Sequence, residues 1–476
     1  MPELFYVLLA AIALTSFVAA RGGNDVSGFY RGVDVHGREP GVLMLTFSQV
    51  TTWIFARSLL TAAILAFHYG ILGGIAYAAY YLCFFTGGVI IDRLRFRAGH
   101  GSVQSFLRQH YGRVGTTLYN VTIALRLLSE VFANVLVVGI IFGSAGTVPY
   151  AVAVVAISLA TLAYSMKGGL FASLRTDVLQ MGILLAALGV LLVVLTGTDA
   201  WSAAATLSSG TWQLGSGLDL LLVALLQAWS YPLHDPVMMD RGLIANRRTT
   251  RLSFVYAGML GIACVLAFSL LGVHAGLNAH EGETMNAALE RLLGAEAMMV
   301  FNVALIISAV STLDSTLSSA AKLVVQDLGW GSSTVRHGRA AMLAFMLGGL
   351  AFVFLGNDDI YAAVAISGTA SMYLTPVVFF TILGNRTAPV WSYAASFAIA
   401  FGGAILYLLE SSGIIAVFEP WFGITASYTK LLAIVAFVFV TTNLAFVAGL
   451  LTGRHEPAAW QGKAEAEAEP EPAGTP

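Results

Sequence analysis

Charged residues are scarce in this chain, and their scarcity excludes a water-soluble fold. Only 11% of its 476 residues are Asp, Glu, Lys or Arg, whereas soluble domains carry about 25%. Hydrophobic residues make up 58%, and the mean hydropathy is +0.80. A soluble fold would leave far too much apolar surface in contact with water. We therefore expect an all-α integral membrane protein that lies in a lipid bilayer.

Other features that are missing exclude whole classes of function. The two cysteines, Cys83 and Cys264, lie in apolar segments and do not indicate a disulfide framework. The sequence has no phosphate-binding loop, no GxSxG elbow, no dinucleotide fingerprint and no regular cluster of metal ligands, which argues against a pump or an enzyme. A net charge of −2 gives no sign of a nucleic-acid partner. No basic segment precedes Leu4–Ala20, so we expect a retained membrane helix there and not a signal peptide.

Long apolar runs dominate the chain. A membrane span needs about 20 apolar residues, and on that rule we expect thirteen spans. They are 4–20, 42–68, 70–91, 115–143, 148–166, 170–196, 218–239, 252–275, 297–325, 339–355, 359–383, 389–409 and 430–452. Ser102–Tyr111 is typical of an amphipathic helix at the membrane interface. The tail after Arg454 is rich in Ala, Glu and Pro and is expected to be disordered.

The basic residues predict the orientation of the spans. With the N-terminus outside, most of the 24 Lys and Arg residues, Arg241 among them, fall in loops on the inner side. The positive-inside rule then predicts a multi-pass protein of the cell membrane with a cytoplasmic C-terminus.

Ionisable residues within the expected spans are costly, and each needs a reason. The notable ones are Arg57, Arg126, Glu130, Asp177, Asp235 and Asp314. A purely structural explanation exists for Arg126 and Glu130, which lie four residues apart on one helix face and can neutralise each other. Asp314 has no adjacent cation. It lies in the segment 308–319, where seven of twelve residues carry a hydroxyl group. That face would supply half of an oxygen cage for a small monovalent cation, and carbonyls of a broken helix would supply the rest.

Interrupted helices are expected at two places. Pro232 and Pro236 in span seven each remove a backbone donor. Span two carries a polar run, 46–53, without proline or glycine, and a break there is inferred from that run. Spans two to six and seven to eleven then form two five-helix halves of opposite topology, because five is odd.

Three motifs resemble those of the sodium:solute symporter family, in its solute carrier 5-like, proline-transporter-like branch. They are KGGLFASLRTDVLQ at 167–180, DRGLIANRRTTR at 240–251 and STLDSTLSSAAKLVVQDL at 311–328. The resemblance implies a LeuT-type 5+5 inverted repeat. It divides the chain into an extra helix and loop (1–40), a transport core (41–385), two C-terminal helices (386–453) and a cytoplasmic tail (454–476).

The resemblance also implies two cation sites. The first, shared across the family, would use the carbonyls of Phe47, Val50 and Ser308 and the hydroxyls of Ser311 and Thr312. The second would use Asp177, Asp314 and Ser315. Asp314 departs from the hydroxyl residue usual in relatives, and two close carboxylates raise the pKa of one of them. The resemblance therefore implies a site that would bind a second sodium ion or carry a proton, and the expected co-transported ions are one or two Na⁺, with no other metal.

A solute site is expected at the midplane, between the two broken helices. Its candidate residues are Gln49, Thr51, Trp53, Arg57, Arg126, Tyr231, His234 and Asp235. A guanidinium suits a carboxylate, which favours an amino acid or a small organic acid. That preference holds only if neither arginine pairs with Glu130 or Asp235.

The expected function is therefore sodium-coupled symport of a small organic solute into the cell, without enzymatic activity. One alternative is a proton-coupled carrier that uses Asp177 and Asp314 as its relay. The other is a symporter-like membrane sensor. The sequence leaves open the solute and the oligomeric state, for which a monomer is the default.

Overall fold

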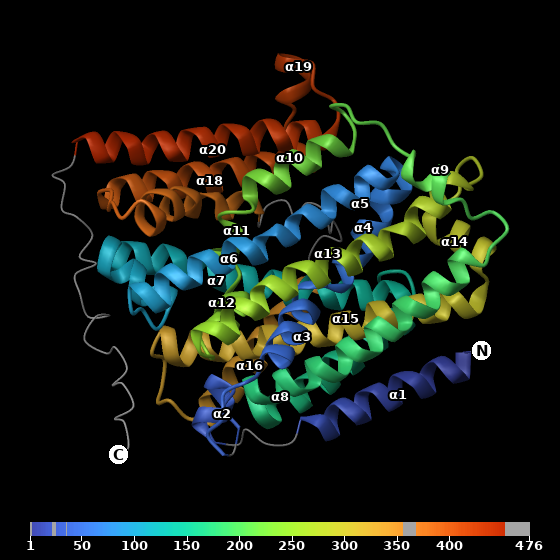
Figure 1. The fold of residues 1–476 in the computed structure, drawn as a ribbon, viewed down its shortest axis with the longest axis horizontal. Coiled ribbons are helices and arrows are strands. Elements are labelled where there is room, and N and C mark those ends of the chain that lie inside the picture. The colour runs from blue at the N-terminus through green and yellow to red at the C-terminus, as the bar shows by residue number, and fades with distance from the viewer. Residues whose placement is uncertain (1, 21–24, 35, 356–367, 453–476) are drawn as a thin grey trace, which may run out of the picture.

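A computed structural model describes residues 2–20, 25–34, 36–355 and 368–452, which form helices and connecting loops (Figure 1). The expected tail 454–476 and the first part of the expected span 359–383 lie outside the described residues. The helices of the first half are α1 (Pro2–Ala19), α2 (Val26–Arg31), α3 (Val42–Trp53), α4 (Ala56–Tyr69), α5 (Ile71–Ala78), η1 (Ala79–Leu82), α6 (Cys83–Ile91), η2 (Asp92–Arg97), α7 (Val103–Phe142), α8 (Val148–Thr196) and α9 (Ala203–Leu207). Those of the second half are α10 (Gly217–Gln227), α11 (Tyr231–His234), α12 (Pro236–Gly242), α13 (Arg247–Leu277), α14 (Met285–Leu293), α15 (Ala295–Lys322), η3 (Leu323–Asp327), α16 (Val335–Leu355), η4 (Ser371–Leu374), η5 (Val377–Leu383), α18 (Val390–Ser411), α19 (Phe418–Phe422) and α20 (Ser427–Thr452).

Length and composition identify the helices that can cross a membrane. In the described part of the chain, eight continuous helical segments are long and apolar enough, and the bent pair α3–α4 makes a ninth. The protein is therefore a multi-pass membrane protein. The count of thirteen spans is not confirmed, in part because one long helix, α8, runs through a glycine kink and covers two expected spans. Gly112 (φ 61°) bends α7 and Gly169 (φ 55°) bends α8, whose 49 residues cover the two expected spans 148–166 and 170–196.

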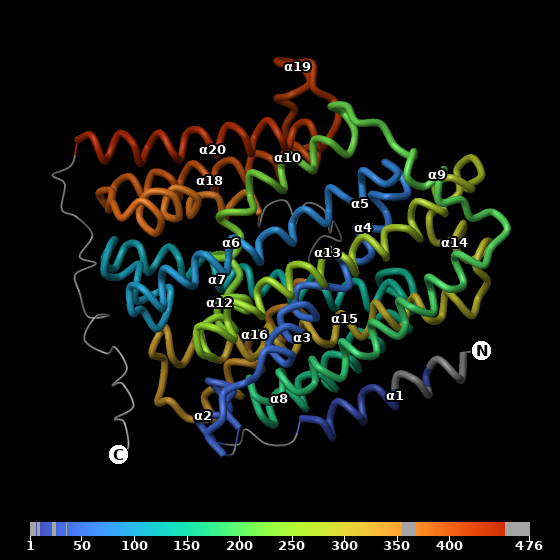
Figure 2. The backbone as a smooth tube through the Cα atoms, in the orientation of Figure 1, coloured from blue at the N-terminus to red at the C-terminus, as the bar shows by residue number. Residues whose placement is uncertain are grey.

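The helices pack in layers around α15. This helix has its most extensive contacts with α8 and also packs against α7 and α3. Figure 2 shows α3, α8 and α15 close together, while α18 and α20 lie along the opposite edge of the molecule. The N-terminus of α1 lies at the same end as α9 and α14, and α2 lies at the other end (Figure 1). This arrangement agrees with the expected topology, in which the N-terminus and the loops at α9 and α14 share one side.

The break between α3 and α4 was expected from a polar run alone. The structure confirms it: the two helices meet at a bend of 62°. No proline or glycine causes the bend, and side chains from distant helices take up the backbone groups that it frees. The Trp53 carbonyl accepts a hydrogen bond from the Tyr81 hydroxyl at 2.8 Å, and the Ala56 N–H donates to Asn134 at 3.2 Å. These bonds substitute for the missing helical ones at a buried position.

The second expected break is also confirmed, between α10, α11 and α12. Pro232 and Pro236 lie at the starts of α11 and α12, where a missing N–H costs least. The Leu233 carbonyl accepts from the Tyr119 hydroxyl at 2.8 Å, and Asp235 caps α12 by accepting from the Met238 N–H at 2.8 Å. Two interrupted helices thus meet near the middle of the molecule.

Close packing of α13 on α4 yields a first prediction. A Cβ atom added at Gly272 would lie 1.9 Å from the Ala63 carbonyl oxygen, so α4 would have to move. We expect Gly272→Ala to lower the free energy of unfolding by about 1–3 kcal/mol, measured as a lower melting temperature in detergent. Gly182→Ala is the matched control, because a Cβ atom there would have no neighbour within 4 Å. Equal melting temperatures for the two variants would show that this contact tolerates a methyl group.

Candidate functional site

Four buried charges lie beside the break between α3 and α4. Arg57 Nη2 lies 2.6 Å from Glu130 Oε1, and Arg126 forms a second ion pair with the same carboxylate. Arg126 also lies 3.5 Å from Asp235, which caps α12. Two guanidinium and two carboxylate groups give a net charge of zero. Both arginines are therefore paired, and the argument for a carboxylate solute from an unpaired guanidinium does not hold. The structural pairing of Arg126 with Glu130, weighed as the alternative, is present.

Aromatic rings surround these charges. A cavity of about 30 Å³, room for little more than one water molecule, lies between the broken helices and α5–η1. The Phe55 ring, inside the break, lies 5.2 Å from the Arg57 guanidinium carbon and 5.5 Å from that of Arg126. Trp53 and Tyr231 meet edge to face with ring centroids 5.5 Å apart. The cavity is lined by Trp53, Phe55, Arg57, Ser58, Tyr77, Tyr80, Tyr81 and Tyr231.

Several buried polar atoms of the expected solute residues lack a hydrogen-bond partner among the described residues. They are the amide nitrogen and oxygen of Gln49, Nε1 of Trp53, Nε and Nη1 of Arg57, and Nε of Arg126. Buried polar groups are nearly always paired, so such a cluster indicates a ligand or water that would pair with them. All but one of these atoms are donors, which favours a ligand rich in acceptor oxygens.

Thr51 and His234, the two other expected solute residues, differ from each other in their placement. The Thr51 hydroxyl donates to the Phe47 carbonyl at 2.7 Å and so faces its own helix. His234 is buried in α11, and its ring lies 5.9 Å from that of Tyr231. The structure thus gathers Trp53, Arg57, Arg126, Tyr231, His234 and Asp235 around one region, although their contact with a solute remains a prediction.

The residues expected for the shared sodium site lie where α15 meets the end of α3. The Ser308 hydroxyl donates to the Ile54 carbonyl, which belongs to the break itself. The Thr312 hydroxyl donates to the Ser308 carbonyl at 3.0 Å. The carbonyls of Phe47 and Val50 lie inside α3, where Val50 accepts from the Ile54 N–H at 2.8 Å. The carbonyl of Ile54 is therefore a candidate sodium ligand that the sequence did not predict, because the position of the break was unknown.

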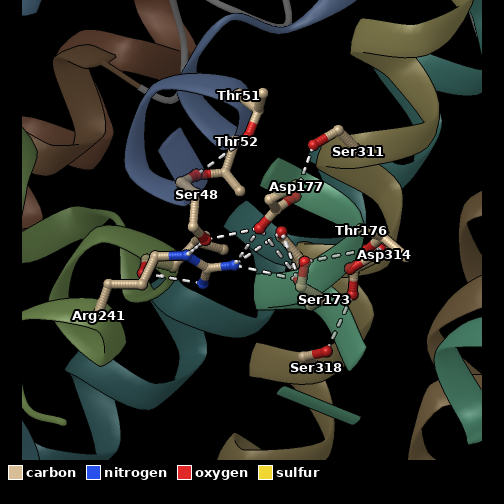
Figure 3. A network of polar contacts seen from close by, with 12 residues as sticks. Ser48, Thr51, Thr52, Ser173, Thr176, Asp177, Arg241, Ser311, Asp314 and Ser318 are labelled. Atoms are coloured by element: carbon tan, nitrogen blue, oxygen red, sulfur yellow. Dashed lines mark hydrogen bonds and ion pairs between the residues drawn. The ribbon is translucent and has the colours of Figure 1, made fainter. Parts of the chain in front are cut away.

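The second expected cation site forms a single hydrogen-bonded cluster in the structure (Figure 3). Asp177, on α8, accepts hydrogen bonds from the Ser48 hydroxyl of α3 at 2.6 Å and from the Ser311 hydroxyl of α15 at 2.7 Å. The Ser173 hydroxyl lies 2.9 Å from that of Ser315. All five residues are buried. Asp177 thus connects three helices, and Ser311 links the two expected cation sites.

Arg241 corrects the sequence interpretation. It was assigned to an inner loop, but its side chain has no exposed surface and points into the Asp177 cluster (Figure 3). Nε donates to Ser48 at 2.7 Å, and Nη2 donates to Ser315 at 2.8 Å. The error lay in the end of span seven, placed at residue 239, whereas α12 continues to Gly242.

Asp314 lies at the edge of the same cluster. Its Oδ2 accepts from the Thr176 hydroxyl at 2.7 Å, and its Oδ1 has no hydrogen-bond partner among the described residues. With Asp177 and Arg241, the cluster holds two carboxylates and one guanidinium. One further positive charge or one proton would make it neutral.

No family model and no curated protein sequence matches this chain. Among solved structures, it resembles a Na⁺-coupled sialic acid symporter in a substrate-bound, outward-open state. The TM-score is 0.70 and the identity 15%, over 96% of this chain and 98% of the other. It also resembles a transporter of the nucleobase-cation-symport-1 family in a closed conformation with bromovinylhydantoin bound. There the TM-score is 0.59 and the identity 12%, over 93% and 98% of the two chains. Both are LeuT-fold transporters, so the expected all-α, LeuT-type fold is confirmed. At these identities the likeness establishes the fold alone, and membership of the sodium:solute symporter family stays a prediction.

Proposed function

We propose that this protein is a sodium-coupled symporter that moves a small organic solute inward across the cell membrane. One observation carries the proposal: the hydroxyl-rich face of α15 meets the broken helix α3–α4, with Ser308 bonded to the Ile54 carbonyl. Backbone carbonyls at a break, together with hydroxyls, are the oxygen ligands that suit a small monovalent cation. The similar fold of a Na⁺-coupled sialic acid symporter supports the same ion.

The arrangement implies how the ion and the solute are coupled. A sodium ion held by Ser311, Thr312 and carbonyls near the end of α3 would bridge α15 to the broken helix. That bridge would fix the end of α3, and with it Trp53, which lines the cavity beside the break. Two ligands that favour one conformation strengthen each other's binding by the same factor. Each sodium ion that moves inward through 100 mV contributes about 2.3 kcal/mol, to which its concentration gradient adds.

The neutral charge cluster narrows the class of solute. A small organic acid would add an uncompensated negative charge to four groups that already balance. A zwitterion adds none: its carboxylate would accept from the unpartnered nitrogens of Arg57 and from Trp53 Nε1. Its ammonium group would lie against the faces of the aromatic rings around the cavity. We therefore propose an amino acid or a similar zwitterion as the solute.

The first test measures thermal unfolding of the purified protein in detergent against sodium, potassium and choline chloride. A ligand that binds only the folded state stabilises it by about 2.7 kcal/mol at a hundredfold excess over its Kd. We expect stabilisation by sodium alone, and a further rise with zwitterionic amino acids only when sodium is present. Identical melting curves in the three salts would contradict sodium coupling. A rise with monocarboxylic acids but not with amino acids would contradict the choice of solute.

Proton coupling is the second candidate, and Asp314 favours it. The unpartnered Oδ1 atom and the surplus carboxylate of its cluster are what a proton carrier requires. If protons are the coupling ion, an imposed pH gradient would drive solute uptake into proteoliposomes in the absence of sodium. Asp314→Asn would then abolish the dependence of uptake on the pH gradient. Uptake driven by sodium at constant pH, and retained in Asp314→Asn, would exclude this candidate.

A further inference from the structure

A residue of the chain itself supplies a positive charge to the oxygen cluster around Asp177. Arg241 reaches from α12 into the space between α3, α8 and α15 (Figure 3). Its Nη2 donates to the Ser315 hydroxyl at 2.8 Å and lies 3.4 Å from Asp177 Oδ2. Its Nε donates to the Ser48 hydroxyl at 2.7 Å. One fixed cation therefore lies where a second sodium ion was expected.

The guanidinium and a sodium ion would need the same oxygen atoms. Three hydroxyls of the Asp177 cluster, those of Ser48, Ser173 and Ser315, each lie within 3.2 Å of an Arg241 nitrogen. A sodium ion bound to these oxygens would lie in contact with the guanidinium. Two like charges repel strongly in a buried site of low dielectric constant. The ion can therefore enter only if the guanidinium leaves.

Neighbouring contacts hold the guanidinium in place. The next residue in the chain, Asp240, pairs with Lys322 of α15 and accepts a hydrogen bond from the Ser319 hydroxyl at 2.7 Å. Arg241 Nη1 also donates to the Val237 carbonyl of its own helix at 3.3 Å. The arginine thus extends from a short helix that is itself fastened to α15, and its charge cannot be exchanged for an ion while α12 stays in contact.

We propose that Arg241 replaces the second sodium ion, so that each transport cycle carries one sodium ion, bound where α15 meets the α3–α4 break. This inference rests on the proposed function. Its consequence is a limit on accumulation: with one ion, the solute gradient at equilibrium follows the first power of the sodium gradient, and with two ions it would follow the square.

The test counts the sodium ions that bind to each chain, using radioactive sodium and the purified protein without solute. We expect one ion for the wild type and one for Asp177→Asn, because Asp177 pairs with Arg241 and does not bind an ion. Thr312→Ala, which alters only the shared site, is expected to bind none over the same range of concentration. Arg241→Ser frees the cluster and is expected to bind two. The double variant Arg241→Ser/Asp177→Asn and the charge-retaining variant Arg241→Lys are expected to bind one.

Other sodium counts would contradict either this inference or the proposed function, and the two cases can be told apart. Two ions on the wild type, falling to one in Asp177→Asn, would overturn this inference and leave sodium symport intact. A single ion on well-folded Arg241→Ser would overturn it as well. No sodium on a wild-type protein with a cooperative thermal transition would overturn the proposed function itself. If Arg241→Ser does not fold, the wild-type count alone still decides between one ion and two.

Discussion

Thr312→Ala is expected to weaken sodium binding roughly 10- to 100-fold, which corresponds to a loss of about 1.5–3 kcal/mol for a contact with a charged group. Thr312 lies on α15 one turn beyond Ser308, and its hydroxyl donates to the Ser308 carbonyl at 3.0 Å, its one hydrogen bond within the described part of the chain. Removal of the hydroxyl leaves the Asp177 cluster unchanged, so the effect reports on the shared site alone. The measurement is the sodium concentration that gives half of the thermal stabilisation, compared between the variant and the wild type.

The same helix offers a matched control. The Ser318 hydroxyl also bonds to a backbone carbonyl of its own helix, that of Asp314, at 3.1 Å. It lies about two turns further along, away from the α3–α4 break, so Ser318→Ala is expected to leave sodium affinity unchanged. Thr312→Ser keeps the hydroxyl and is expected to retain binding. Equal losses in Thr312→Ala and Ser318→Ala would mean that the hydroxyls of α15 act through helix packing and not as ligands.

The apolar runs predicted the helices, because they are local features, whereas the resemblance to the symporter family, and not a local pattern, implied that Asp177 lies near Asp314. The Ser311–Asp177 hydrogen bond at 2.7 Å joins two of the predicted residues directly. The exact place of the first break was not predictable. α3 ends at Trp53, where Tyr81 and Asn134 from other helices satisfy the freed backbone groups, and no local pattern encodes those contacts.

The buried ion pairs also show that contacts between residues far apart in the sequence could not be predicted. The spacing of Arg126 and Glu130 on one helix face predicted their pairing, which the structure contains. Arg57 reaches the same carboxylate from 73 residues away, and nothing in the sequence indicates that contact. Arg241 was missed for a different reason: an error of a few residues in the end of a span moved a buried side chain into a loop. The ends of elements are the least certain part of such predictions, and here one of them carried a functional side chain.

Glu130→Gln is expected to lower the free energy of unfolding by about 3–5 kcal/mol, because it leaves buried guanidinium charge without its partner. Arg57 would have no carboxylate within ion-pair distance among the described residues, and Arg126 would keep only the 3.5 Å contact with Asp235. The measurement is the melting temperature of the purified protein and its yield from the membrane. Asn134, which donates to the Glu130 carbonyl at 2.9 Å, keeps that bond, so the helix itself is not altered.

Two further variants separate charge balance from other effects. Glu130→Gln/Arg57→Gln removes one charge of each sign and leaves Arg126 with Asp235, so it is expected to recover most of the lost stability. Glu283→Gln breaks an ion pair of the loop before α14, where Arg291 holds the pKa of Glu283 down to about 2. That pair is exposed to solvent, and its loss is expected to leave the melting temperature within about 1 °C of the wild type. If the double variant is no more stable than Glu130→Gln, the cluster is not held by charge balance. A zwitterionic solute, which is inferred from that balance, would then no longer be favoured over an anionic one.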